Sequence, residues 1–217
     1  MKKIFSPLFH GISDEEWQEM QTVHCMRQSS FIKNAVILHA GTVVSEIGIV
    51  MCGNVHIESN DFQGNRSLLS NVSVGQIFAE TYALCHEPMM VDVVAAENCE
   101  ILFMNLNILI NERYSKCSWQ HKFMKNILNA SVQKNLVLSN RIFCTTPKSA
   151  RARILTYLSY QSVKEGHTTF EIPFNRQQMA DYLNLDRSAL SKELGRMRDE
   201  GILEFHKNQF TLNRTVQ

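Results

Sequence analysis

Four polar residues near the carboxyl-terminal end of the chain have side chains suited to contact nucleic acid. Arg187, Ser188, Ser191 and Lys192 lie in the first turns of a segment whose apolar residues have helical spacing. Arginine and lysine donate hydrogen bonds to O6 and N7 of guanine, and a serine hydroxyl can serve several bases. The N-terminal residues of such a helix contact base edges when it enters the major groove. The four residues are therefore the candidate base contacts.

A second polar group stands at the start of the preceding predicted helix. It consists of Asn175, Arg176 and Gln177. The free N–H groups and the positive dipole end of a helix start suit a phosphate oxygen. We therefore expect these residues, together with Lys207 in a predicted hairpin turn, to contact the DNA backbone. The alternative is that the charges form a solvated face, since helix-turn-helix folds also serve as protein–protein modules.

Three short elements must hold these residues in place. Asn175 is followed three residues later by the glutamine of a capping box, which predicts the start of the first helix. A tight turn at Asn184 leads to Asp186, which can cap a second helix that we expect to end at Gly201. Two short helices joined by a small turn form a helix-turn-helix. The segment ILEFHKNQFTLN that follows predicts a two-stranded hairpin, the wing of a winged helix.

A longer helix is predicted upstream, over residues 118–142, which contain no glycine or proline. Residues in one row repeat at alternating spacings of three and four, and they form the candidate dimer interface: Phe123, Ile127, Ala130, Lys134 and Val137. A helix of this length spans about 37 Å, which is more than one small domain covers. A twin helix from a second copy is the simplest partner. The alternative is that the helix packs between two domains of one chain.

The part of the chain before this helix has the pattern of a β domain. From Phe31 to Met104 short apolar runs alternate with turn residues, as in a small antiparallel barrel or roll. Ser13 and Glu16 have the spacing of a capping box, which predicts a short helix ahead of the roll. After the long helix, Thr145 or Thr146 is the expected cap of the next helix, with Pro147 in its first turn.

The order of these elements, with RQQMADYLNLDRSALSKELGRM plus the wing, and Gly41, Gly53, Gly75 and AETYAL in the roll, resembles the CRP/FNR family of bacterial transcription regulators. The resemblance covers nearly the whole chain. It implies an α+β fold with an N-terminal, jelly-roll-like β-roll over residues 5–116, a long dimerisation helix over 117–143 and a C-terminal winged helix-turn-helix over 147–217. The roll would be a cyclic-nucleotide-binding-like effector domain.

The resemblance also implies partners and a mechanism. The expected partners are a second copy of the chain, a palindromic double-stranded DNA operator and RNA polymerase. An effector in the roll, or its absence, would shift the populations of two states and set the two recognition helices about 34 Å apart. The family's base-contacting helix typically carries Arg, Glu and Arg, whereas this chain has Arg187, Ser188 and Lys192. The operator sequence therefore cannot be transferred from other members.

The effector is not identified by the sequence. In members that bind cyclic AMP, a Gly-Glu pair contacts the ribose and an Arg-Ser pair contacts the cyclic phosphate. The matching residues here are Ala79, Glu80, Met90 and Val91, which make up the candidate effector pocket. Burying an anionic phosphate without an arginine or comparable donors is costly. Cyclic AMP is therefore disfavoured as the effector.

Other cofactors and an enzymatic role are also disfavoured. An iron–sulfur cluster needs clustered thiolates, and only Cys25 lies near the N-terminus. Haem would need an axial ligand such as Cys85 or His86. The pair His39 and His56 suggests the alternative of a cupin-like metal-binding enzyme or sensor with an accessory helix-turn-helix, but the further metal ligands are missing. The absence of a nucleophile–base pair or a phosphate loop indicates a protein that is not an enzyme.

Composition and charge agree with a DNA-binding regulator in the cytoplasm. Of the residues, 44% are hydrophobic, but no apolar run is long enough to cross a membrane, and the N-terminus lacks the apolar stretch of a secretory signal. The overall net charge is +1. Residues 145–217 hold 11 Lys and Arg against 8 Asp and Glu, whereas residues 1–144 hold 11 against 13. The basic excess thus lies in the part predicted to face DNA.

Overall fold

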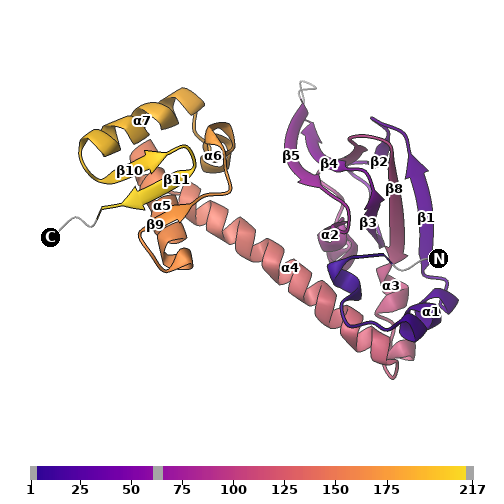
Figure 1. The fold of residues 1–217 in the computed structure, drawn as a ribbon. Helices are drawn as coiled ribbons and strands as arrows, with labels where there is room; N and C mark the ends of the chain where they lie inside the picture. Colours follow the sequence, from indigo (N-terminus) through magenta and orange to yellow (C-terminus); the bar gives the residue numbers. More distant parts are fainter. Residues whose placement is uncertain (1–3, 61–65, 214–217) are drawn as a thin grey trace. The chain divides into compact units, whose positions relative to one another are not determined.

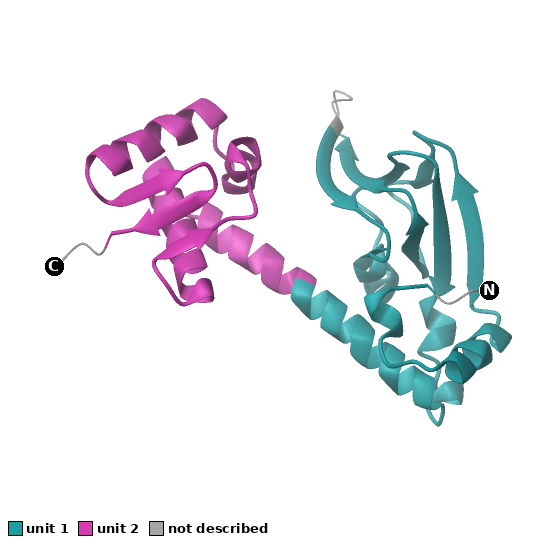
Figure 2. Cartoon of the chain, in the orientation of Figure 1, with its two compact units in different colours: residues 1–133 teal, residues 134–217 magenta. Residues whose placement is uncertain are grey.

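The structure of the chain, a computed structural model, describes residues 4–60 and 66–213. The chain forms two compact units, one up to Gln133 and the other from Lys134 onward (Figures 1 and 2). The boundary falls inside the long helix α4, Ser118–Thr145. The predicted α+β class, with a roll, a long helix and a winged helix-turn-helix, is confirmed.

Two antiparallel four-stranded sheets form the roll of the N-terminal unit. One sheet has the strand order β1-β8-β3-β6 and the other β2-β7-β4-β5. The strands are β1 (Met26–Phe31), β2 (Val36–Leu38), β3 (Glu46–Cys52), β4 (Val55–Asn60), β5 (Arg66–Val72), β6 (Ile77–Phe78), β7 (Asp92–Ala95) and β8 (Cys99–Asn105). The short helix α2, Glu80–Cys85, follows β6. This arrangement pairs strands that are distant in sequence, such as β1 with β8.

The central strand β8 is buried on both faces. Ile101 and Phe103 belong to the cluster inside the roll, whereas Leu102 and Met104 belong to a second cluster on the other side of the sheet. Successive side chains of a strand point to opposite faces, so a strand covered on both sides is apolar throughout. Inside the roll Phe78 leaves room for no side chain at Gly48, because a Cβ built there would lie 2.0 Å from its ring.

The outer cluster is covered by helices. The 3₁₀ helix η1 (Pro7–Phe9), α1 (Asp14–Thr22), α3 (Leu106–Leu109) and the first turns of α4 surround it, and the 3₁₀ helix η2 (Glu112–Tyr114) leads into α4. The predicted capping box of α1 is confirmed, since Ser13 and Glu16 each accept from the other's backbone N–H. Glu16 also accepts from Lys122 Nζ at 2.7 Å, which ties α1 to α4.

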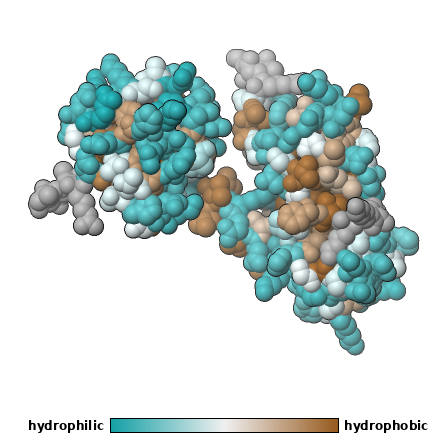
Figure 3. Space-filling model, in the orientation of Figure 1, coloured by the Kyte–Doolittle hydropathy of each residue, from teal (hydrophilic) through white to brown (hydrophobic). Residues whose placement is uncertain are grey.

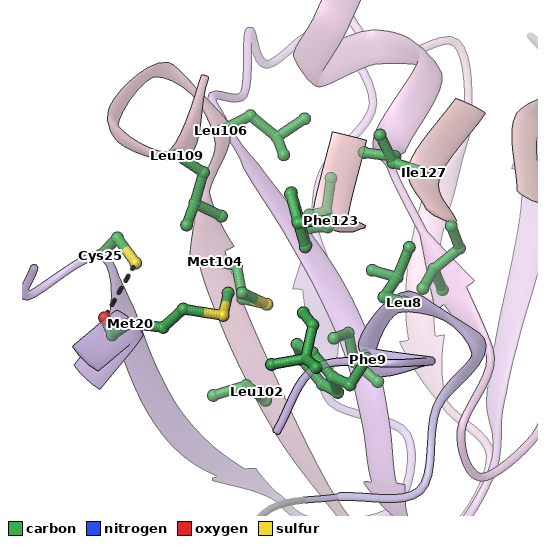
Figure 4. Close-up of a cluster of buried hydrophobic side chains, with 14 of the residues drawn as sticks. Leu8, Phe9, Met20, Cys25, Leu102, Met104, Leu106, Leu109, Phe123 and Ile127 are labelled. Carbon is green, nitrogen blue, oxygen red and sulfur yellow. Dashed lines mark hydrogen bonds between the residues drawn. The ribbon is translucent and has the colours of Figure 1, made fainter. Parts of the chain in front are cut away.

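The position of α4 corrects the predicted dimer interface. Phe123 and Ile127 are buried in the chain's own core beside Leu8 and Phe9, so they are not free to meet a second copy (Figure 4). Ala130 packs partly against the same core. Lys134 and Val137 continue this row of the helix and are exposed, and the helix carries further exposed apolar residues on its other side.

The start of the next helix also differs from the prediction. Helix α4 continues to Thr145, and Ser149 rather than a threonine caps α5, Ala150–Glu165. The Ser149 hydroxyl accepts from the N–H of Ala152 at 3.1 Å. The hydroxyls of Thr145 and Thr146 instead donate to carbonyls of the last turn of α4. Pro147 lies in the connection and not in the first turn of α5.

The C-terminal unit is a winged helix-turn-helix. After α5 come β9 (Thr169–Glu171), α6 (Arg176–Leu183), α7 (Arg187–Asp199), β10 (Leu203–His206) and β11 (Gln209–Leu212). The strands form one antiparallel sheet in the order β10-β11-β9. The core of this unit gathers apolar side chains from all the helices, including Ile154, Leu158, Met179, Leu183, Leu190 and Leu194. The predicted helices, turn and wing are confirmed.

Candidate nucleic-acid interface

Helix α7 begins at a strong cap. Asp186 accepts from the backbone N–H groups of Ser188 at 2.8 Å and Ala189 at 3.0 Å, and it also accepts from the Ser188 hydroxyl. The Ser188 hydroxyl and these two N–H groups lower the pKa of Asp186. Asp186 therefore stays ionised near neutral pH, and its negative charge stabilises α7 by interacting with the positive end of the helix dipole.

Three of the four predicted base contacts are exposed on α7 with their polar ends available. Arg187, Ser191 and Lys192 lie on the solvent side of the helix. Ser188 is exposed too, but its hydroxyl proton is already given to Asp186. The apolar residues on the opposite side, Leu190, Leu194 and Met197, are completely buried. The polar side of α7 therefore faces solvent, whereas its apolar side packs in the core of the C-terminal unit.

A salt-bridge network from α5 fixes the rotation of α7 about its axis. Arg151 donates to Glu193 Oε1 at 2.6 Å and to both carboxylate oxygens of Glu200 at 2.7 Å. These contacts lower the pKa of Glu200 and raise that of Arg151. A guanidinium that bridges two carboxylates holds them in a planar geometry. No periodic pattern in the sequence marked Arg151, because its partners lie more than 40 positions away.

At the start of α6 the predicted cap is present, whereas Arg176 packs against the wing. Asn175 and Gln178 form the capping box. The guanidinium carbon of Arg176 lies 4.9 Å from the Phe205 ring and 5.3 Å from the Phe210 ring, and Nη2 donates to the Lys207 carbonyl at 3.1 Å. Burial lowers the pKa of Arg176. Arg176 therefore holds the wing against α6, and its contact with a phosphate stays a prediction.

Three of the four predicted backbone contacts line one groove. Asn175, Arg176 and Lys207 line a hollow of about 640 Å³, with Lys164 and Asn208. Lys207 is exposed in the turn of the wing and has a left-handed backbone with φ of 53°. Gln177, in contrast, is absent from the groove lining and donates to Asp181 one turn along its own helix at 2.8 Å. The structure thus brings the start of α6 and the tip of the wing together.

The candidate effector residues include no cationic partner for a cyclic phosphate. Ala79 has a φ of 64° and Glu80 is only 4% exposed, whereas Met90, at the position of the phosphate arginine, is 82% exposed. Val91 is half-buried. No lysine or arginine occurs between Arg66 and Arg113, a stretch that includes six acidic residues. The residues present therefore do not fit a cyclic nucleotide.

The histidines of the alternative metal site are not joined by further ligands. His39 is exposed in the connection after β2, and His56 lies on β4 with Nδ1 3.6 Å from Glu58 Oε1. Among residues 4–60 and 66–213, no three His, Cys, Asp or Glu side chains are grouped so that they could hold a metal ion. No helix in the same part of the chain is long and apolar enough to cross a membrane.

Comparisons with known families match both units. Residues 28–111 match the cyclic nucleotide-binding domain family, and residues 152–215 match the Crp-like helix-turn-helix domain family. A comparison with curated protein sequences gives no significant match.

Several solved structures share the fold over nearly the whole chain. The catabolite activator protein of Thermus thermophilus is 20% identical with a TM-score of 0.52, and the match covers 96% of this chain and 94% of that one. A CooA mutant from Carboxydothermus hydrogenoformans is 18% identical with a TM-score of 0.59, over 97% and 93%. CprK complexed with OCPA is 14% identical with a TM-score of 0.61, over 90% of each chain.

A roll followed by a winged helix-turn-helix with an exposed polar recognition helix defines a two-domain transcription regulator. The chain belongs to the CRP/FNR family of such regulators. The cupin-like enzyme is not favoured by these matches, since both matched domains are those of regulators.

Proposed function

We propose that two copies of this chain bind one DNA duplex, with α7 of each copy in a major groove. The observation that carries this proposal is the exposed edge of α7, where Arg187, Ser191 and Lys192 project from a helix that is fixed by its buried side and by Arg151. Arg187 and Lys192 are suited to guanine and Ser191 to several bases. At the groove, which Glu165 and Glu171 also line, the start of α6 at Asn175 and the side chain of Lys207 are suited to neighbouring phosphates.

The proposed dimer uses a different row of α4 from the one predicted. Met124, Leu128, Leu138 and Ile142 are exposed, the last three by 60% or more. Together with Ser131 and Asn135 they follow the spacing 4-3-4-3-4 of a two-stranded coiled coil. Hydrophobic surface on α4 is visible in Figure 3. A parallel helix pair would cover this row and orient the two α7 helices for successive major grooves.

The roll is proposed to respond to something other than a cyclic nucleotide. The acidic stretch from residue 67 to residue 112 and the exposed Met90 support this proposal. The matched family is the cyclic nucleotide-binding domain, and this chain carries Met90 and Val91 where cyclic-AMP-binding members have the arginine and serine that contact the phosphate. We propose that the chain acts without enzymatic activity in the cytoplasm, where its DNA lies, and that RNA polymerase is the partner through which it alters transcription.

The proposed function is tested by selecting duplexes from a random-sequence DNA pool with the full chain. The selection is run with the purified chain alone and with the small-molecule fraction of a bacterial extract, which supplies an effector if one is needed. We expect an enriched inverted repeat whose half-sites are centred about 10 base pairs apart. An Arg187→Ala, Lys192→Ala double variant serves as the control and should enrich no such repeat. The absence of any enriched motif under both conditions would overturn the proposal.

A further inference from the structure

The C-terminal end of α6 is stabilised by two arginines from outside the helix-turn-helix. The last carbonyls of an α-helix lack partners within the helix. Here Arg141 Nε and Nη2 donate to the carbonyls of Tyr182 at 3.3 Å and Asp181 at 3.2 Å. Arg153 Nη1 donates to the carbonyls of Leu183 at 3.2 Å and Asn184 at 2.9 Å. Four consecutive carbonyls, from Asp181 to Asn184, therefore accept hydrogen bonds from two guanidinium groups.

The two arginines come from the two helices that precede the helix-turn-helix. Arg141 lies near the end of α4 and Arg153 near the start of α5. Arg153 Nε also donates to the carbonyl of Pro147 at 2.8 Å, so the same side chain holds the connection between α4 and α5. The end of α4, the connection and α5 thus all meet the turn at Asn184.

The last turns of α4 have further attachments within the C-terminal unit. Cys144 is completely buried in the core of this unit. Asn140 Nδ2 donates to the hydroxyl of Tyr160 on α5 at 2.8 Å. The guanidinium of Arg141 also lies 5.9 Å from the Tyr182 ring. These contacts make the end of α4 part of the body that carries α7.

We propose that Arg141 and Arg153 are positioning residues that fix the direction of α7 relative to the end of α4. Helix α7 is capped by Asp186, only two residues after Asn184, so a displacement of the turn displaces the start of α7. Arginine suits this role because one planar group donates to several carbonyls, and its charge favours the negative end of α6. In a dimer joined through α4, this clamp sets the spacing between the two half-sites. The inference rests on the proposed function.

The test measures how strictly the chain requires one half-site spacing. The probes are the duplex enriched by the unaltered chain, the same duplex with one base pair added or removed in its centre, and a single half-site. One base pair turns the second half-site by about 34° and shifts it by about 3.4 Å. We expect the unaltered chain to lose about tenfold in affinity on either altered spacing. Arg141→Ala and Arg153→Ala should lose less than about threefold, while binding to the single half-site changes little.

Three further variants separate positioning from loss of charge and loss of folding. Lys148→Ala removes a positive charge from the same connection and should keep the strict spacing. Arg141→Lys and Arg153→Lys keep the charge but not the forked donors, and they should relax the spacing as the alanine variants do. They replace the alanine variants if those do not fold.

An unchanged spacing requirement in the clamp variants would overturn the positioning role alone. A loss on the single half-site as large as the loss on the full duplex would also overturn it, because the arginines would then support only the fold of the unit. If the unaltered chain enriched no sequence at all, the proposed function would fail and the positioning role with it.

Discussion

Arg187 is the side chain on which base recognition is expected to depend most directly. It is exposed in the first turn of α7. Arg187→Ala should weaken binding to the enriched duplex by about 1 to 3 kcal/mol, because a bidentate contact to one guanine is lost, and it should relax the preference at one base pair of each half-site. Fluorescence anisotropy titrations on single-substitution duplexes measure both effects.

The matched control is Lys207→Ala in the wing, where the charge is exposed beside the groove. It should weaken enriched and scrambled duplexes by similar factors and reduce the salt slope by about one phosphate contact per chain. Equal losses on both duplexes for Arg187→Ala would remove Arg187 from base recognition and leave it to Ser191 and Lys192.

Glu16 should make the N-terminal unit sensitive to acid. The hydrogen bond from Lys122, with those from the Ser118 hydroxyl and the Ser13 N–H, lowers the pKa of Glu16 to about 2. Since this pKa lies below that of the unfolded chain, ionised Glu16 stabilises the fold above about pH 4.5, and this contribution is lost as the pH falls toward 2. Glu16→Gln should therefore lower the free energy of unfolding by about 1 kcal/mol at pH 7. This is less than a fully buried ion pair would contribute, because solvent screens the charges.

Thermal unfolding of the unaltered chain and the Glu16→Gln variant between pH 7 and pH 3 measures this effect. The difference in stability should shrink as the pH falls. A constant difference at every pH would show that the ionised carboxylate contributes nothing through its lowered pKa.

Three of the four predicted helix caps are confirmed, all but that of α5, whereas the arginine contacts could not be predicted from the sequence. Ser13, Asn175 and Asp186 act on N–H groups two or three residues away, so the local sequence contains the whole interaction. Arg151 and Arg153 act on groups about 30 to 50 positions away, which only the tertiary fold brings close. The contacts of Arg176 could not be predicted either, because they are made with the wing, about 30 residues further along the chain.

Helix α4 carries two apolar rows, and the sequence alone does not say which of them faces the core. The row of Phe123 and Ile127 lies against η1 and the outer face of the sheet, and the row of Leu128 and Leu138 is exposed. Both rows have alternating spacings of three and four over this length. Only the packing of the N-terminal segment against α4, through Leu8 and its neighbours, distinguishes them.

Leu128→Asp should therefore convert the dimer to a monomer. Two buried aspartates at a helix pair cannot be hydrated and repel each other. The control is Val137→Asp, which also places a charge at an exposed apolar position of α4 but on the other side of the helix. Light scattering should show a monomer for the first variant and a dimer for the second. A dimer for Leu128→Asp, or a monomer for Val137→Asp, would contradict the assignment of the seam to the row of Leu128 and Leu138.

Phe123→Ala tests the other row of the same helix. The side chain is completely buried in the outer cluster of the N-terminal unit. Its truncation should cost about 3 to 5 kcal/mol of unfolding free energy, through lost burial and the cavity left behind. Denaturant unfolding measures this cost. A loss below about 1 kcal/mol would contradict the assignment of Phe123 to the core.

At the level of the whole chain, cyclic AMP should not act as the effector. Met90 is exposed and the sequence has no lysine or arginine between positions 67 and 112, so the segment that aligns with the phosphate-binding residues supplies no such partner for a cyclic phosphate. Isothermal titration calorimetry with cyclic AMP should give no heat of binding at micromolar concentrations, and operator affinity should be unchanged. Micromolar binding that is lost in Glu80→Gln would contradict this prediction.

The order of the domains was readable from the sequence because each has its own period: short apolar runs in the roll, helical spacing in α4, and the helix-turn-helix with its wing. The division of the chain into two units inside α4 could not be predicted, because the helix itself is continuous there. The effector could not be predicted either. Met90 and Val91 replace the side chains that contact the phosphate of cyclic AMP. They therefore disfavour this ligand, but they do not indicate which other ligand would bind.

Two chains are expected to recognise one specific DNA sequence. The most direct measurement is a titration of the full chain, at fixed salt, against the enriched duplex and a scrambled duplex of the same composition, with the mass of each complex determined. We predict an affinity for the enriched duplex at least about a thousandfold higher, in a complex of two chains per duplex. Equal affinities for the two duplexes, or a saturated complex that holds one chain, would contradict specific recognition of DNA by two chains.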